Sequence, residues 1–128
     1  MSFSSEPWPE CGIARFLSLL EGPWATLIVR DLLPGPARFT ELRRGLVGIS
    51  PHTLSSRLRR FEAHGIVTRT VHAEIPPRVV YELTDLGQSL RPVLEAMDAW
   101  ALTVPLAPDP DEAAEAAAPR EVGATSRS

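Results

Sequence analysis

The feature that most constrains the fold is a change of hydrophobic period near the middle of the chain. Before Gly65, apolar residues recur every three or four positions, which is the spacing of amphipathic helices. After Gly65, residues 66–74 and 79–84 are rich in β-branched side chains that roughly alternate with polar ones, which is typical of strands. Residues 75–78, with the sequence Ile-Pro-Pro-Arg, join the two runs. The pattern therefore predicts a β-hairpin with a stiff tip.

Helices are expected on both sides of this hairpin. The apolar spacing predicts them over about 13–20, 24–33, 40–46, 51–64 and 85–103, with a short extended piece over 37–39. Ser50 and Pro51 suit the N-cap and the first helical position of the fourth helix. Thr84 can cap the last helix, and Pro92 within that helix is expected to kink it. The order predicts a mainly α fold with a small β-hairpin (α+β), which is a winged helix-turn-helix.

Composition predicts a single globular domain with irregular ends. The chain has 128 residues, 44% of them hydrophobic and 23% charged, which is enough for one core without disulfides. We expect an irregular lead-in over 1–10, the winged helix with its dimerisation helices over 11–103, and a mobile acidic tail rich in proline and alanine over 104–128. No apolar run approaches the roughly 20 residues of a membrane helix, and no secretory signal is evident, so a cytoplasmic protein is expected.

The residues for catalysis or metal binding are not arranged as those functions require. The single cysteine predicts neither an internal disulfide nor a cysteine-based zinc site, and the histidines show no ligand spacing. No catalytic triad in a plausible context, glycine-rich phosphate loop or paired-carboxylate motif is present. We therefore expect no metal, no cofactor and no enzymatic activity.

The charge distribution indicates a polyanion-binding surface. The net charge is −3, but residues 38–69 carry seven arginines against two carboxylates and so have a net charge of +5. This basic segment contains the predicted helix-turn-helix, whose second helix enters the major groove of DNA in proteins of this class. The DNA-binding residues that we predict are basic or small and polar. They are Arg38, Arg43, Arg44, Ser50, His52, Thr53, Ser55, Ser56, Arg57, Arg59, Arg60 and Arg78.

Several of these arginines have a second interpretation. Arg59 and Arg60 are expected on the outward face of the fourth helix as DNA contacts, against the alternative of a solvated pair. Leu54, Leu58 and Phe61 recur at helical spacing and are expected to form the apolar stripe of the fourth helix. Arg57, beside this stripe, either contacts a phosphate or pairs with Glu41. Arg78 at the hairpin tip is expected to enter the minor groove or hold flanking phosphates, or else to keep the tip soluble.

The first turn of the fourth helix also has two interpretations. His52 and Thr53 are the best candidates for contacts to base edges. The alternative for His52 is an exposed residue at the start of the helix with no DNA contact. Ser50 is expected to act mainly as the cap.

Six segments of the chain, in order and with matching spacing, resemble the HxlR family of bacterial winged-helix transcriptional regulators. They are Cys11–Trp24, Leu32–Leu42, Gly48–Leu58, Gly65–Arg69, Pro76–Thr84 and Gly87. The resemblance covers about residues 11–103. The family usually has a lysine before the tryptophan, where this chain has Pro23, so a polar role at that position does not carry over.

The resemblance implies a homodimer that binds a pseudo-palindromic operator as a repressor or activator. Two recognition helices would enter successive major grooves. The first and last helices would form the dimer interface, and an oxidant or small molecule could act as effector. The predicted interface residues are Ile13, Phe16, Leu17, Leu90, Leu94, Met97 and Trp100. The alternative function is a winged-helix protein-interaction module without specific DNA binding.

Cys11 is a candidate redox sensor. In some members of the resembling family, a cysteine near the start of the first helix senses oxidants or electrophiles. A helix N-terminus and Arg15 would lower the pKa of the Cys11 thiol, whereas Glu10 would oppose this. The alternative is an inert thiol. Without a second cysteine, sensing would require an intersubunit disulfide or a small-molecule adduct.

Overall fold

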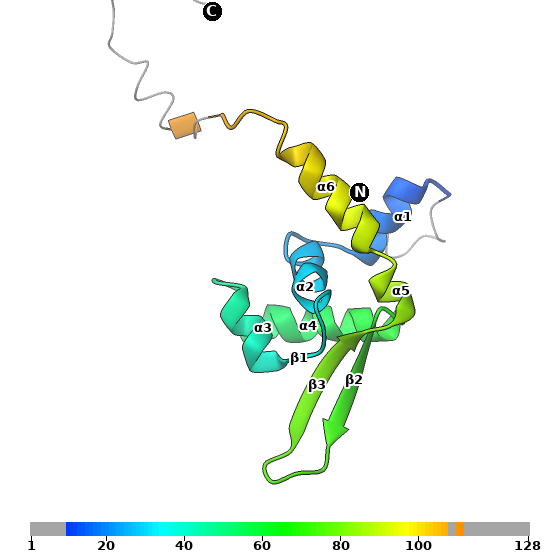
Figure 1. The fold of residues 1–128 in the computed structure, drawn as a ribbon, viewed down its shortest axis with the longest axis vertical. Helices are drawn as coiled ribbons and strands as arrows, with labels where there is room; N and C mark the ends of the chain where they lie inside the picture. Colours follow the sequence, from blue (N-terminus) through cyan, green and yellow to red (C-terminus); the bar gives the residue numbers. More distant parts are fainter. Residues whose placement is uncertain (1–9, 108–109, 112–128) are drawn as a thin grey trace, which may run out of the picture. The chain divides into compact units, whose positions relative to one another are not determined.

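The structure, a computed structural model, describes residues 10–107 and 110–111 (Figure 1). Most of the predicted lead-in and of the predicted tail therefore lies outside the described residues. The chain divides into two compact units between Met97 and Asp98. The first unit contains the helix-turn-helix and the hairpin, and the second begins within the last turns of α6.

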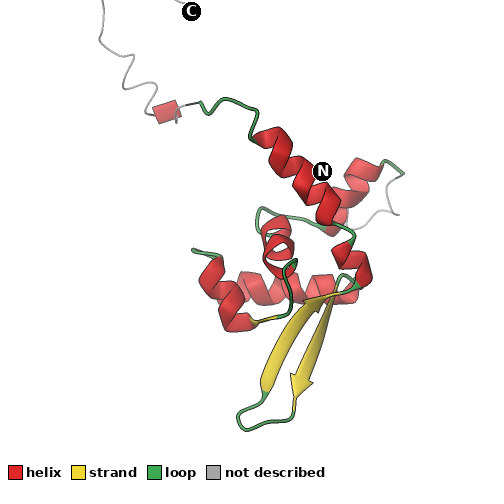
Figure 2. Cartoon of the chain, viewed as in Figure 1, coloured by secondary structure: helices red, strands yellow, loops and turns green. Residues whose placement is uncertain are grey.

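The order of elements confirms the predicted winged helix-turn-helix (Figure 2). The elements are α1 (Gly12–Leu19), α2 (Ala25–Leu32), β1 (Ala37–Arg38), α3 (Phe39–Gly45), α4 (Pro51–Ala63), β2 (Val67–His72), β3 (Arg78–Leu83), α5 (Asp85–Gln88) and α6 (Arg91–Ala101). Helices α3 and α4 form the helix-turn-helix. The hairpin of β2 and β3, the wing, projects away from the helices (Figure 1).

Local sequence determines both ends of α4. The Ser50 hydroxyl accepts a hydrogen bond from the Thr53 amide at 3.0 Å, so the predicted N-cap is confirmed. Pro51 follows in the first turn, where its missing N–H has no partner to lose. At the other end, Gly65 adopts a φ of 74°, a conformation that favours glycine, and the chain turns into β2.

The core lies where α2 and α4 meet. The predicted stripe of Leu54, Leu58 and Phe61 is fully buried, and so are Ile28 and Leu32 of α2. Burying one large apolar side chain contributes about 1.5–3 kcal/mol. The stripe therefore fixes which face of α4 is turned to the core, and leaves the opposite face to solvent.

The sheet has three strands, in the order β1-β3-β2, and all neighbours are antiparallel. The short β1 adds to the free edge of β3, a pairing that the sequence did not predict. In the hairpin, Val67 pairs with Leu83 and His72 pairs with Arg78. The first strand of the hairpin is shorter than expected, and the second begins and ends one residue earlier than expected, so Arg78 is the first residue of β3. The ladder extends as far as Arg78, so this residue is not part of the connecting loop as predicted but directly adjoins the tip.

The predicted single last helix is wrong, because the helical segment is broken into α5 and α6. Ser89 and Leu90 separate the two helices, and Pro92 is the second residue of α6. Proline lacks an N–H donor, and the first turn of a helix is the one place where none is needed. The break removes the penalty that a proline in the middle of a longer helix would have carried.

A tight junction connects the base of the wing to the helices, and we call it the wing joint (Gly65, Ile66, Thr84 and Gly87). The Thr84 hydroxyl donates to the Gly65 carbonyl at 2.6 Å and accepts from the Gly87 amide at 3.1 Å. The Thr84 amide donates to the Ile66 carbonyl at 3.0 Å. A Cβ atom on Gly87 would overlap that same carbonyl oxygen, so only glycine permits this approach. The end of α4, both strands and α5 are thus joined at one point.

Candidate nucleic-acid interface

The face of α4 opposite the buried stripe is small, polar and basic. We call it the outward face (His52, Ser55, Ser56 and Arg59). His52 and Arg59 are exposed, and the two serines are half-buried. Arg59 Nη1 donates to Ser55 Oγ, one turn earlier, at 3.1 Å. Guanidinium, imidazole and hydroxyl groups all bind DNA phosphates or base edges, and short side chains allow the helix to approach closely.

The first turn of α4 is occupied by the cap. Thr53 is half-buried, and its hydroxyl accepts from Ser50 Oγ at 2.9 Å while its amide donates to the same serine. Ser50 itself is exposed. Of the two residues predicted to contact base edges, His52 is therefore the one whose side chain is exposed.

Arg60 does not share the outward face with Arg59, which corrects its predicted position. Its Nη2 donates to the carbonyl oxygen of Ser18 in α1 at 2.5 Å. Residues 59 and 60 differ by about 100° around a helix axis, and this rotation carries Arg60 to the flank that packs on α1.

Arg57 lies on the same flank as Arg60. Its guanidinium group lies against Gly22 in the connection between α1 and α2. Among the described residues no ion pair joins Arg57 to Glu41, whose carboxylate instead accepts from the Arg38 amide at 2.7 Å and caps α3. The predicted alternative of an Arg57–Glu41 pair is therefore wrong.

Three arginines around α3 have exposed side chains: Arg38 before its first turn, and Arg43 and Arg44 in its last turn. Arg38 makes its hydrogen bond to Glu41 through the backbone amide, and its side chain is exposed. Together with the outward face of α4, these residues keep the basic character that the sequence predicted for this segment.

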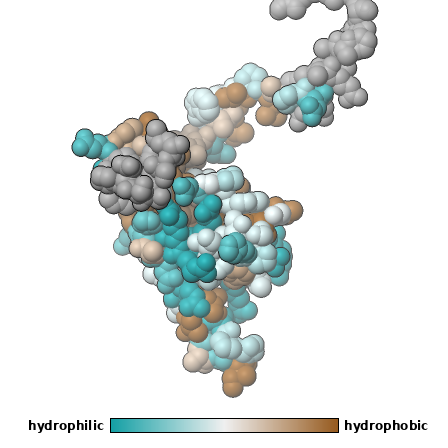
Figure 3. All heavy atoms as spheres, turned by 180° about the vertical axis from the view of Figure 1, so that it is seen from behind, coloured by the Kyte–Doolittle hydropathy of each residue, from teal (hydrophilic) through white to brown (hydrophobic). Residues whose placement is uncertain are grey.

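The tip of the wing combines an ion pair with an exposed apolar side chain. Arg78 donates from Nε and Nη2 to Glu74 Oε2 at 3.2 and 3.0 Å. The neighbouring Ile75 is fully exposed, and in Figure 3 the extreme end of the wing is brown, with paler, more polar side chains beside it. Glu74 was not among the predicted site residues, although its spacing of four residues from Arg78 across the tip is compatible with an ion pair.

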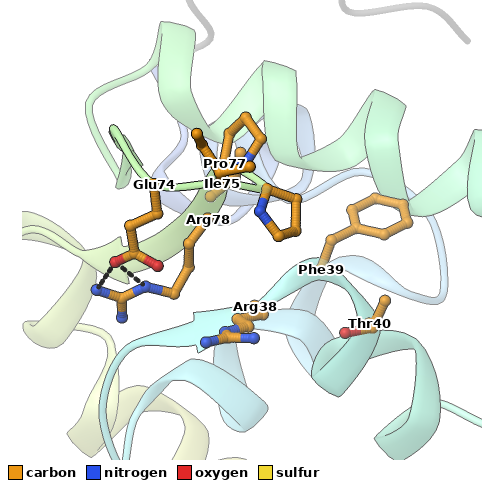
Figure 4. Close-up of a pocket in the computed structure, with 9 residues that line it drawn as sticks. Arg38, Phe39, Thr40, Glu74, Ile75, Pro77 and Arg78 are labelled. Atoms are coloured by element: carbon orange, nitrogen blue, oxygen red, sulfur yellow. Dashed lines mark hydrogen bonds and ion pairs between the residues drawn. The ribbon is translucent and has the colours of Figure 1, made fainter.

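A hollow of about 350 Å³ lies between the wing tip and the start of α3 (Figure 4). Arg78 and Phe39 lie on opposite sides of it, with Arg38 and Thr40 along the α3 side. The Glu74–Arg78 ion pair forms part of the wing side. Phe39 and Thr40 could not be predicted as lining residues, because the closeness of α3 to the wing depends on the unpredicted pairing of β1 with β3.

Cys11 is exposed at the N-cap of α1. The backbone amides of Ala14 and then Ile13, at the start of α1, favour the thiolate and hold the pKa of the Cys11 thiol below the ordinary value of a cysteine. The direction is the one expected for a thiol at a helix N-terminus. A lowered pKa increases the fraction of reactive thiolate at neutral pH, so the geometry is compatible with a reactive cysteine.

The predicted dimer-interface residues fall into two groups. Ile13, Leu17, Met97 and Trp100 are exposed, and Trp100 retains 70% of its accessible surface. The other three are half-buried and pack against the core: Phe16, Leu90 and Leu94. The first group is the one with apolar surface available for a partner.

Two kinds of feature are absent from residues 10–107 and 110–111. No helix there is both long enough and apolar enough to cross a membrane. No cluster of three or more histidine, cysteine, aspartate or glutamate side chains is arranged to hold a metal ion.

Residues 19–105, which include the helix-turn-helix and the wing, match the family described as HxlR-like helix-turn-helix. The chain belongs to this family of transcriptional regulators. An HxlR-like relative from Synechocystis, the uncharacterised HTH-type transcriptional regulator sll1512, is 46% identical over 87 residues. These residues are 68% of this chain and 64% of that protein, so the chain spans less than two thirds of this relative.

Solved structures similar to this HxlR-like chain include two regulators that were determined in defined redox states. The redox regulator HypR in its oxidised form has a TM-score of 0.70 and 33% identity, covering 76% of this chain and all of that one. The reduced form of YodB from Bacillus subtilis has a TM-score of 0.67 and 36% identity, covering 79% of this chain and all of that one. Both likenesses extend over the whole length of the solved chains.

Proposed function

We propose that this HxlR-like protein is a homodimeric regulator that binds a specific DNA operator through the outward face of α4. The observation that carries the proposal is that this face presents His52 and Arg59 to solvent, directly opposite a stripe that is fully buried. The helix is thus held rigidly by its core side while its polar side is free to enter a major groove. In keeping with this role, we also propose that the protein is located in the cytoplasm and is not an enzyme.

Positioning on the DNA would come from the arginines around the recognition helix. Arg43 and Arg44 would contact phosphates beside α3, and Arg38 would contact the backbone near the hollow. Phosphate contacts of this kind fix register and orientation without specifying sequence. Sequence preference would then depend on His52 and Arg59, the latter held by Ser55 and close to Ser56.

Dimerisation would join the exposed apolar side chains of α1 and α6. Ile13, Leu17, Met97 and Trp100 are large, and each keeps 45% or more of its surface accessible. Burial of this surface by a second copy would be favourable at about 25 cal/mol per Å². A two-fold dimer would bind a pseudo-palindromic operator with half-sites about one helical turn apart.

Regulation would act through Cys11 or through a small molecule. HypR is titled a redox regulator, and YodB has been solved in diamide-treated and quinone-bound forms. Cys11 is the single cysteine of this chain, is exposed and has a lowered pKa. Sensing would therefore use a disulfide between subunits or an adduct on this thiol.

The experiment is a titration of the full chain with the DNA upstream of its own gene, at two salt concentrations and with excess competitor DNA. We expect salt-sensitive binding that survives the competitor. The same titration with diamide, on wild type and Cys11→Ser, tests the sensor. If the protein does not retain the upstream DNA in the presence of competitor at either salt concentration, the regulator proposal is contradicted. An equal diamide response in both proteins would exclude Cys11.

A further inference from the structure

Two arginines of the recognition helix point away from the DNA-facing side and toward the end of α1. We call them the arginine clamp (Arg57 and Arg60). Arg60 Nη2 donates to the Ser18 carbonyl oxygen at 2.5 Å and lies 4.0 Å from Glu21 Oε1. These contacts join segments 42 residues apart in the sequence.

The Arg60 contact satisfies a group that α1 cannot satisfy itself. Ser18 lies in the last turn of α1, where carbonyl groups have no partner within the helix. Ser18 is also buried, with 7% of its surface accessible, so water has little access to the residue. The helix C-terminus carries a partial negative charge, which favours a guanidinium at this position.

The Arg57 contact depends on the shape of the connection between α1 and α2. Gly22 has a φ of 90°, and a Cβ atom there would lie 2.6 Å from Arg57 Nη2. A larger residue would therefore be strained in its backbone and would displace the guanidinium group. The Nε atoms of Arg57 and Arg60 are buried without hydrogen-bond partners among the described residues, so the inner part of each guanidinium group lies against the protein, although a third of the Arg60 side chain stays accessible.

We infer that the arginine clamp is a positioning device, which transmits the placement of α1 to the recognition helix and so sets DNA affinity. The inference rests on the proposed function. Helix α1 begins at the exposed Cys11 and carries Ile13 and Leu17 of the proposed dimer interface. A modification or a partner that displaces α1 would move Ser18 and Gly22, and the clamp would then reorient α4. Arg57 and Arg60 are thereby assigned a role other than the DNA contact expected from the sequence.

The test measures DNA affinity at several salt concentrations for Arg60→Ala, Arg60→Lys and Gly22→Ala, with thermal melting of each. The probe is a duplex that the wild-type protein selects from a randomised library. Arg30→Ala is the charge-matched control, because Arg30 is exposed on α2 and paired with Asp31. Gly22→Ala disturbs the clamp from the α1 side without removing any charge.

We expect Arg60→Ala and Gly22→Ala each to weaken specific binding by roughly tenfold, with the slope of log affinity against log salt unchanged. Arg60→Lys keeps one donor for the Ser18 carbonyl and should recover part of the loss. Arg30→Ala should bind as wild type does. If Arg60→Ala does not fold, Gly22→Ala and Arg60→Lys still give the comparison.

Two results would overturn the inference. The first is a salt slope that falls by about one in Arg60→Ala while Gly22→Ala binds normally, since that is the signature of a lost phosphate contact. The second is wild-type affinity in all clamp variants despite lower melting temperatures, which would mean that the clamp only stabilises the fold. Failure of the proposed function itself is distinct, because the wild-type protein would then select no duplex.

Discussion

Arg59 and Arg60 are adjacent in sequence and identical in chemistry, yet the fold uses them differently. Arg59 is exposed on the outward face and bonded to a serine of its own helix, one turn away. Arg60 is bonded to the backbone of a different helix, far away in the sequence. The basic segment thus contains arginines in two structural settings, one facing solvent and one bonded to the elements that pack against α4.

The largest expected effect comes from the stripe that holds both groups in place. Phe61→Ala removes a fully buried ring from the core and should lower the free energy of unfolding by about 3–5 kcal/mol. Urea denaturation followed by circular dichroism measures the loss. Ser56→Ala on the outward face is the control and should change stability by no more than about 0.5 kcal/mol. Equal losses in the two variants would contradict the assignment of inner and outer faces.

Arg59→Ala tests the solvent-facing group. A lost base or phosphate contact should weaken binding to the selected duplex by about 1–3 kcal/mol, while the melting temperature stays close to that of wild type. A fluorescence anisotropy titration at several salt concentrations gives the affinity and the slope. Unchanged affinity would mean that the outward face does not touch DNA, and the comparison with Arg60 would lose its functional meaning.

Ser50→Ala tests the start of the helix from which both groups project. Loss of the cap should lower the free energy of unfolding by about 1 kcal/mol, since the Thr53 amide loses its acceptor. Ser50→Asn keeps a capping oxygen and should restore most of the stability. If both substitutions reduce stability equally in thermal melting, the hydroxyl has a role other than capping.

Glu74→Gln tests a third arginine, Arg78. Its guanidinium group is paired with the carboxylate of Glu74, whereas that of Arg59 donates to a serine and that of Arg60 donates to a backbone carbonyl. Neutralising Glu74 should release Arg78 and remove a negative charge near the proposed DNA path. Exposed ion pairs contribute about 0.2–1 kcal/mol, so we expect a gain in DNA affinity of a few-fold at low salt. Glu95→Gln on α6 is the control. Weaker binding of Glu74→Gln would show that the ion pair orders the wing for DNA.

The sequence was sufficient where a local pattern determines the structure. The period of Leu54, Leu58 and Phe61 predicted the buried side of α4, and Ser50 and Gly65 marked its ends. In the candidate site, the same period correctly placed His52 and Arg59 on the exposed face.

The sequence was insufficient where a contact between distant segments decides. Arg60 lies near the border between two faces, and only the position of Ser18 in α1 determines which way it turns. The pairing of β1 with β3, and with it the hollow beside Phe39, depends on three separate segments meeting. A proline at position 92 is consistent with either one kinked helix or two separate helices, so the sequence alone did not distinguish between them.

The wing joint has a consequence for how such a protein can change its reach along DNA. The joint fixes the direction of the hairpin at its base, while the length of the hairpin is determined at the other end, near residues 73–77. Adding one residue to each strand would extend the wing by about 3.4 Å and leave its direction unchanged. An extra residue in one strand alone would shift the register and turn the apolar side chains over. The length of the wing and its direction are thus set at opposite ends of the hairpin. Sequence changes near the tip can therefore alter the length of the wing without changing its direction.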